Sequence, residues 1–220
     1  MIGMLIAASG TAFILLLGEY LWQKRTLKGE YARKFVHILA ATYAASWPFF
    51  ISRISITLLS VIFILSLVII KKTGLFKSMH SIKRATYGEI WYAVGIGVLA
   101  LVFRDNLVYA VAVLHMALAD GFAAIVGVSL NKNAKKFVFN GYTKSIAGSF
   151  TFLLISFLLN IFYWTVVAHP TLVTLNLSPA LYSLISAMAL SLAEIVSPKG
   201  SDNIIVPALA GFLLWLPALF

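Results

Sequence analysis

Residues 193–203 read AEIVSPKGSDN, and apolar runs flank this segment on both sides. It contains Glu194 and Asp202, two of only seven acidic residues in the chain. A carboxylate at the end of an apolar helix is unfavourable in a membrane, and such residues usually mark a functional site. The Ser-Pro and Gly-Ser pairs predict a turn between two membrane helices that brings both carboxylates to one membrane face.

The composition is that of an integral membrane protein. Of the 220 residues, 61% are hydrophobic and 11% are charged, and the mean hydropathy is +0.97. Because lipid leaves no partner for unpaired backbone groups, we expect an all-α fold that forms one membrane domain over residues 1–220. The absence of cysteine excludes disulfides, thiolate nucleophiles and cysteine metal sites.

Eight apolar segments are predicted as transmembrane helices; a span typically needs about 20 residues, and the second segment is short for one. The first lacks the basic start and the cleavage site of a signal peptide, so it is counted as a span. The predicted spans are 1–22, 35–50, 54–70, 90–103, 107–128, 146–167, 179–196 and 204–220.

The net charge of +10 is distributed very unevenly between the connectors. Fifteen of the seventeen lysines and arginines lie in the first, third, fifth and seventh connectors. By the positive-inside rule these connectors are cytoplasmic, which also makes nucleic acid an improbable partner. We therefore predict that Lys28, Lys77 and Lys136 are cytoplasmic and that Asn176 and both termini are external.

Basic residues precede the second span. Arg33 and His37 are four residues apart and therefore share a helix face, with Lys34 beside them. Anchoring at the headgroups explains the two cations equally well, and His37 is as readily a packing residue as a catalytic one.

A similar cluster precedes the fourth span. Lys83 and Arg84 fit simple snorkelling to the surface. Glu89 follows at the start of the apolar run, where the helix dipole favours a negative charge and a purely structural role is sufficient.

Asp120 is harder to explain structurally, because it lies two-thirds along an apolar span. Ala123, Ala124 and Gly127 follow it at helical spacing and predict close contact with another helix. A basic neighbour or a divalent cation is then needed to keep the buried carboxylate charged. Glu194 has a comparable face of small residues.

Asp202 has two readings that the sequence leaves open. Aspartate is a preferred N-cap, so Asp202 could simply begin the last helix. Alternatively, it could hold Mg2+, which takes hard oxygen ligands, retains several waters and needs only one or two protein carboxylates.

The connector before the sixth span is rich in groups that bind phosphate. Helix N-termini attract anions, although the order of residues is not that of a Walker loop. With the carboxylates, these groups suit phosphoryl or nucleotidyl transfer to a lipid. The groups are Lys135, Lys136, Gly141, Lys144, Ser145, Gly148 and Ser149.

Five motifs together resemble the dolichol kinase and phytol kinase family, from residue 33 to about residue 211. The resemblance implies a polytopic kinase that phosphorylates isoprenoid or related lipid alcohols, typically with CTP. The motifs are Arg33-Lys34-x-x-His37, Lys83-Arg84-x-x-x-Gly88-Glu89, Ala119-Asp120-x-x-Ala123-x-x-x-Gly127, Lys144-Ser145-x-x-Gly148-Ser149 and Ala193-Glu194-x-x-Ser197-Pro198-x-Gly200-x-Asp202-Asn203.

One position departs from the family pattern: Ala147 stands where an acidic residue often precedes Gly-Ser. Its role then falls to the remaining carboxylates, or a ligand is missing. Three alternatives remain: a CTP-dependent diacylglycerol kinase, nucleotidyl transfer like that of phosphatidate cytidylyltransferases, and an ion-coupled transporter. The terminal signature of the cytidylyltransferases is absent, and a purely structural subunit would not need the polar clusters.

The resemblance implies a division of roles at the cytoplasmic face. Glu194, Asp120 and Asp202 are the expected catalytic residues, with Mg2+ on Asp120 and Asp202, and Glu194 as the base that orients or deprotonates the lipid alcohol. His37 and Glu89 complete the site. The residues expected to bind the nucleotide or its phosphates are Arg33, Lys34, Lys83, Arg84, Lys144, Ser145, Gly148, Ser149 and Asn203.

Overall fold

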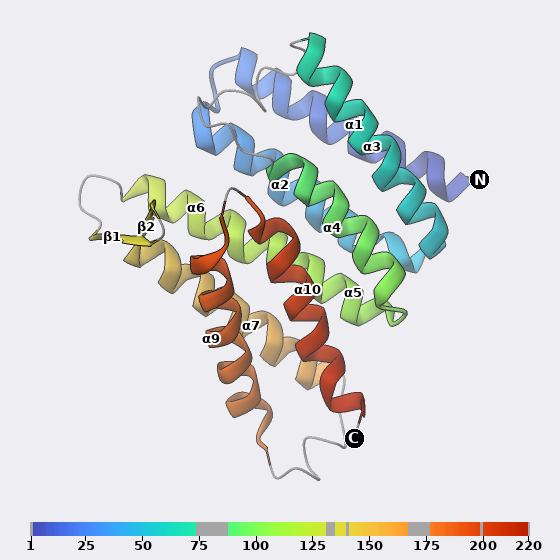
Figure 1. Cartoon of the computed structure of the whole chain (residues 1–220). Coiled ribbons are helices and arrows are strands. Elements are labelled where there is room, and N and C mark those ends of the chain that lie inside the picture. The colour runs from blue at the N-terminus through green and yellow to red at the C-terminus, as the bar shows by residue number, and fades with distance from the viewer. Residues whose placement is uncertain are drawn as a thin grey trace.

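A computed structural model describes residues 2–73, 88–130, 135–139, 141–166, 177–198 and 200–219. Within these ranges the protein is built from apolar helices and one short β-hairpin (Figure 1). The helices are α1 (Ile2–Gln23), α2 (Gly29–Ala45), α3 (Arg53–Thr73), α4 (Gly88–Val102), α5 (Asn106–Leu114), α6 (Asp120–Ser129), α7 (Ile146–Val166), α9 (Pro179–Val196) and α10 (Asp202–Trp215). The strands are β1 (Lys136–Phe139) and β2 (Tyr142–Ser145).

Local sequence signals define several helix starts. The Asp105 carboxylate caps α5 by accepting hydrogen bonds from the backbone N–H groups of Leu107 and Val108, at 2.8 and 2.9 Å. Ser178 caps α9 in the same way, and Pro179 occupies the first helical position, where its missing N–H is not needed.

α5 and α6 form one continuous helix, joined by a π-helical turn at His115–Ala119, and this helix is the centre of the bundle. Helices α2, α7 and α10 pack around it, and α1, α3 and α4 extend the bundle on the side of α2 (Figure 1). In the apolar stretch of the central helix 56% of the residues are buried, against 17–33% in those of the other long apolar helices. A carboxylate on it, such as Asp120, is therefore surrounded by protein.

The predicted all-α class is confirmed, because the structure is overwhelmingly helical. Five helices are long and apolar enough to cross a membrane: α1, α3, the continuous α5–α6 helix, α7 and α9. Helices α4 and α10 are apolar but shorter. Each predicted span coincides with a helix, whereas eight membrane crossings stay a prediction.

Besides small shifts at helix ends, two features differ from the sequence analysis. Helix α2 begins at Gly29, six residues before the predicted start, so the basic motif lies within the helix rather than ahead of it. The connector before α7 contains an antiparallel hairpin in which Lys136 pairs with Ser145, and this hairpin was not predicted.

The two ends of the bundle differ in charge within the described residues. At one end, Arg53 donates to the carbonyl of Arg104 (2.9 Å) and to the side-chain oxygen of Asn106 (2.5 Å). The other end carries the described basic residues of the predicted cytoplasmic connectors. Lys77, Lys83, Arg84 and Asn176 lie outside the described residues, so the roles and sides predicted for them stay predictions.

Candidate functional site

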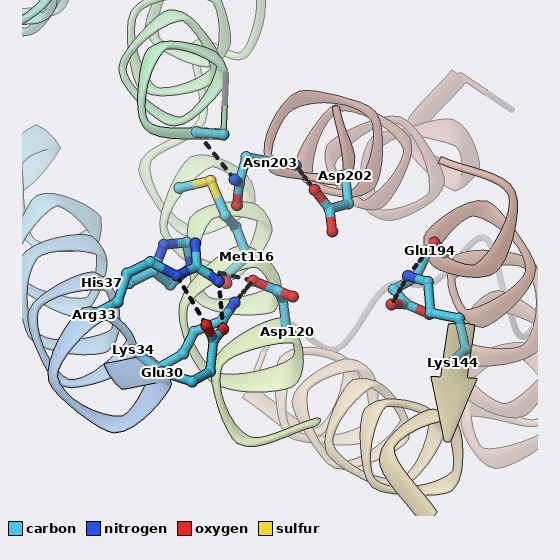
Figure 2. Close-up of polar contacts among 11 residues, drawn as sticks. Glu30, Arg33, Lys34, His37, Met116, Asp120, Lys144, Glu194, Asp202 and Asn203 are labelled. Carbon is cyan, nitrogen blue, oxygen red and sulfur yellow. Dashed lines mark hydrogen bonds and ion pairs between the residues drawn. The ribbon is translucent and has the colours of Figure 1, made fainter. Parts of the chain in front are cut away.

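A buried ion pair between α2 and α6 forms the centre of the site (Figure 2). Lys34 donates to the carboxylate of Asp120, and the two residues are only 3% and 8% exposed. His37, one turn further along α2, places its Nε2 atom 3.4 Å from Asp120 Oδ2. The basic neighbour expected for Asp120 is therefore present.

The π-helical turn directly before Asp120 shapes this centre. The backbone N–H of Asp120 donates to the carbonyl of His115, five residues earlier, instead of to that of Met116. The Met116 carbonyl lies 3.0 Å from His37 Nε2. Turns of this kind occur frequently at functional sites. No sequence signal pointed to the turn or to the Met116 carbonyl.

A second group of charges lies at the start of α2. Arg33 forms an ion pair with Glu30, one turn earlier, and its Nε atom is 3.2 Å from Glu30 Oε2. Glu89, in the first turn of α4, and Asp120 also act electrostatically on the Arg33 guanidinium. Arg33 therefore joins α2 to the acidic side of the site, and Glu30 is a participant that the sequence analysis missed.

A further ion pair connects the hairpin to α9. Lys144, on β2, donates to the Glu194 carboxylate and also to the Glu194 backbone carbonyl, at 3.1 Å. Glu194 Oε2 is buried and has no hydrogen-bond partner among the described residues. Ala187 and Ser191, on the predicted small face of α9, are buried as well.

The turn between α9 and α10 delivers Asp202 to the same site. Gly200 has a φ of +85°, a left-handed conformation that glycine adopts without steric strain. Ser201 occupies the N-cap position and Asp202 is the first helical residue, where its carboxylate accepts a hydrogen bond from the adjacent Asn203 N–H at 3.1 Å. Asp202 is therefore not the N-cap of α10.

Asp202 faces the other charges of the site. Its carboxylate points toward the space between Asp120 and the Lys144–Glu194 pair (Figure 2). It interacts electrostatically with Asp120, Lys34, Lys144 and Glu194, although no lysine or arginine of the described residues pairs with it directly.

Asn203 fixes the position of α10 against α4. Its side-chain nitrogen donates to the Gly88 carbonyl at 3.0 Å, so the starts of the two helices are held together. The side-chain oxygen of Asn203 is buried without a hydrogen-bond partner in the described part of the chain.

The phosphate-binding groups expected at the start of α7 have structural contacts. Ser145 caps the helix by accepting a hydrogen bond from the Gly148 N–H at 2.9 Å. A side chain at Gly148 would lie 2.9 Å from the Ala123 carbonyl, so the glycine permits the close approach of α6 and α7 that the small-residue pattern predicted. Ser149 is partly exposed.

The donor set suits a hard divalent cation held by two carboxylates. Among the described residues, no three histidine or acidic side chains lie close enough to hold a metal ion together. Asp120 and Asp202 repel one another, and Lys34 neutralises only one of them. Mg2+ binds through one or two carboxylates plus substrate phosphates, so this pair fits it.

The chain resembles phytol kinases over nearly its whole length. It is 29% identical to the phytol kinase of Synechocystis sp. over 225 residues, which cover 96% of this chain and 92% of that protein. A chloroplastic protein of Triticum aestivum described as a probable phytol kinase is 29% identical, over 96% of this chain and 79% of its own length. The corresponding protein of Glycine max is 26% identical, over 92% and 71%.

The family resemblance drawn from the motifs is therefore confirmed. No protein-family model matches the chain, and no solved structure matches it significantly.

Proposed function

We propose that this protein is a membrane-embedded kinase that transfers the γ-phosphoryl group of CTP to an isoprenoid alcohol. The observation that carries the proposal is the convergence of Asp120, Asp202 and Glu194 with Lys34 and Lys144 at one end of an apolar bundle. The similarity to phytol kinases supports a lipid alcohol as acceptor. CTP rests on the family resemblance alone.

The cations of the site bind the triphosphate in this proposal. Lys34 and Lys144 lie on opposite sides of the space that Asp202 faces (Figure 2). Phosphoryl transfer depends chiefly on positioning and on charge neutralisation, so two fixed ammonium groups supply much of what the reaction needs. Arg33, the partly exposed Ser149 and the side-chain oxygen of Asn203 are further contacts. Lys83 and Arg84, which lie outside the described residues, are proposed to bind the nucleotide phosphates as well.

Mg2+ would be held by Asp120 and Asp202 and would neutralise charge on the transferring phosphoryl group. The residues of the chain bind the two substrates and position them for the transfer. The alcohol oxygen attacks the γ-phosphorus, and the new O–P bond forms as the bond to the bridging β–γ oxygen breaks, so that CDP leaves with the electron pair. The alcohol proton passes to a carboxylate, for which we propose Glu194, because Asp120 and Asp202 are assigned to the cation.

We place the site at the cytoplasmic face, because the charge distribution between the connectors follows the positive-inside rule. Cysteines introduced at Lys136 and at Arg104 should react with an impermeant reagent from opposite sides of sealed vesicles. Labelling of both from one side would contradict this orientation and the alternation of spans.

The decisive experiment uses purified protein, Mg2+ and either γ- or α-labelled CTP with phytol, dolichol, diacylglycerol or phosphatidate. A kinase of isoprenoid alcohols should transfer only the γ label, and only to phytol or dolichol. Transfer of the α label to phosphatidate would indicate a cytidylyltransferase. Preferential transfer of the γ label to diacylglycerol would indicate a diacylglycerol kinase instead. Equal or better use of ATP would contradict the proposed donor.

A further inference from the structure

An apolar cavity of about 210 Å³ lies between α1, α2, α3 and α4, beside the polar site. Its walls are made mainly of small, aliphatic and aromatic side chains, among them Ala12, Ala40, Ala44, Ile62 and Phe63. Ligand pockets that enclose a whole drug-sized molecule measure roughly 300–1,000 Å³, so this cavity fits only part of a long chain.

Three hydroxyl groups in the walls are already bonded to backbone carbonyls, whereas the Tyr92 hydroxyl and the Trp47 ring N–H have no hydrogen-bond partner among the described residues. Thr11 donates to Ala7 at 2.8 Å, Ser60 to Ala93 at 2.6 Å and Ser66 to Ile62 at 2.8 Å. The walls therefore present mostly apolar surface, and apolar cavities remain dry and accept apolar ligands.

One end of the cavity touches the candidate site. Tyr92 lines the cavity, and its ring centroid lies 5.1 Å from that of His37, which in turn is close to Asp120. From Tyr92 the cavity runs away from the charged end of the bundle, toward Trp47, just beyond the far end of α2, and Ala8 near the start of α1. A molecule placed along it would have one end at the site and the other within the membrane.

The outer wall of the cavity faces lipid. Ala8 and Ala12 are exposed on α1, and Ile62 on α3 is 53% exposed. Little protein lies between the cavity and the bilayer at this point, so a hydrocarbon chain can enter sideways from the membrane.

We propose that this cavity binds the hydrocarbon chain of the acceptor alcohol, with the hydroxyl at the Tyr92–His37 end and the chain directed toward Ala8. The inference rests on the proposed kinase function and adds to it the place of the acceptor. Because lipid is as apolar as the cavity, binding there adds little affinity. The cavity instead selects the shape and length of the chain and orients the hydroxyl toward Asp120.

Filling the part of the cavity that lies farthest from Tyr92 tests the proposal. Ala12→Phe and Ala8→Phe each place a ring there from an exposed helix position, so folding should be unaffected. We expect kcat/KM for phytol to fall roughly tenfold, the effect typical of a changed fit in a hydrophobic pocket. Geraniol, whose short chain occupies only the Tyr92 end, should be phosphorylated within about twofold of the wild-type rate.

Ser9→Phe is the matched control, because Ser9 is exposed on the same helix but does not line the cavity. It should leave both alcohols unaffected. Equal effects of Ala12→Phe on phytol and geraniol, or no effect on either in an active enzyme, would overturn the cavity assignment and leave the kinase proposal standing. A wild-type protein that phosphorylates no alcohol would overturn both.

Discussion

Replacing Asp202 by asparagine separates a chemical role from a structural one. Among the described residues this side chain accepts one backbone hydrogen bond, from Asn203, and asparagine can accept the same bond. The loss of negative charge at a helix N-terminus costs about 0.3–1 kcal/mol. Removing the charge also removes the electrostatic repulsion between Asp202 and Asp120, and this effect stabilises the folded protein. We therefore expect Asp202→Asn to change stability by less than about 1 kcal/mol.

The expected effect on activity is far larger. An amide cannot replace a charged ligand of a hard cation. Loss of one preorganised electrostatic contact to a transition state typically lowers kcat by about 10²–10³. We expect at least a hundredfold fall in phosphoryl transfer from CTP to phytol and a higher Mg2+ concentration for half-maximal activity. The assay follows γ-labelled CTP at several Mg2+ concentrations, together with thermal unfolding in detergent.

Asp105→Asn is the matched control. It makes the same chemical change at the start of α5, where the carboxylate caps the helix at the opposite end of the bundle. Asparagine caps as well as aspartate, so stability and activity should both be retained. Activity of Asp202→Asn within threefold of wild type, at an unchanged Mg2+ requirement, would refute the metal-binding role and leave Asp120 and Glu194 as the candidate ligands.

Three further substitutions test the packing around the site. Lys34→Met should destabilise the protein by about 3–5 kcal/mol, because it leaves the buried Asp120 carboxylate without its lysine partner. Adding Asp120→Asn should restore most of the thermal stability without restoring activity. Gly148→Ala places a methyl group 2.9 Å from a backbone oxygen of α6 and should cost about 1–3 kcal/mol, whereas Ser149→Ala should not alter the melting temperature. Asn203→Leu leaves the Gly88 carbonyl without its donor and should cost about 1–3 kcal/mol; an unchanged melting temperature would show that this bond does not hold α10 to α4.

The sequence predicted the helices well because apolar run length is a strong signal in a membrane protein. The predicted span 179–196 coincides with α9, and the other spans differ from their helices mainly at the ends. The start of α2 was misplaced because Arg33 and Lys34 are polar, and a hydropathy pattern assigns polar residues to connectors. In the structure both continue the helix, and Lys34 is turned inward by Asp120.

The sequence indicated which residues belong to the site better than it indicated which of them form ion pairs with one another. The sequence singled out Lys34, Asp120, Lys144 and Glu194 as separate features, yet nothing in it specified which lysine meets which carboxylate. These pairs join residues 86 and 50 positions apart, so they depend on helix packing. The π-helical turn before Asp120 was not indicated by any feature of the sequence that was singled out.

Helix length explains how charged groups can be accommodated so close to the membrane core. Helices α4 and α10 have 15 and 14 residues, which is about 21–23 Å at 1.5 Å per residue, against a hydrocarbon core of about 30 Å. Both begin at the site, where the Asn203 side chain contacts the Gly88 carbonyl. In the described residues, two helices shorter than the hydrocarbon core therefore begin beside the carboxylates, whereas α6 continues past Asp120 to Ser129. The acceptor proposed above, a lipid alcohol, has no large headgroup that would keep its hydroxyl away from carboxylates at this level.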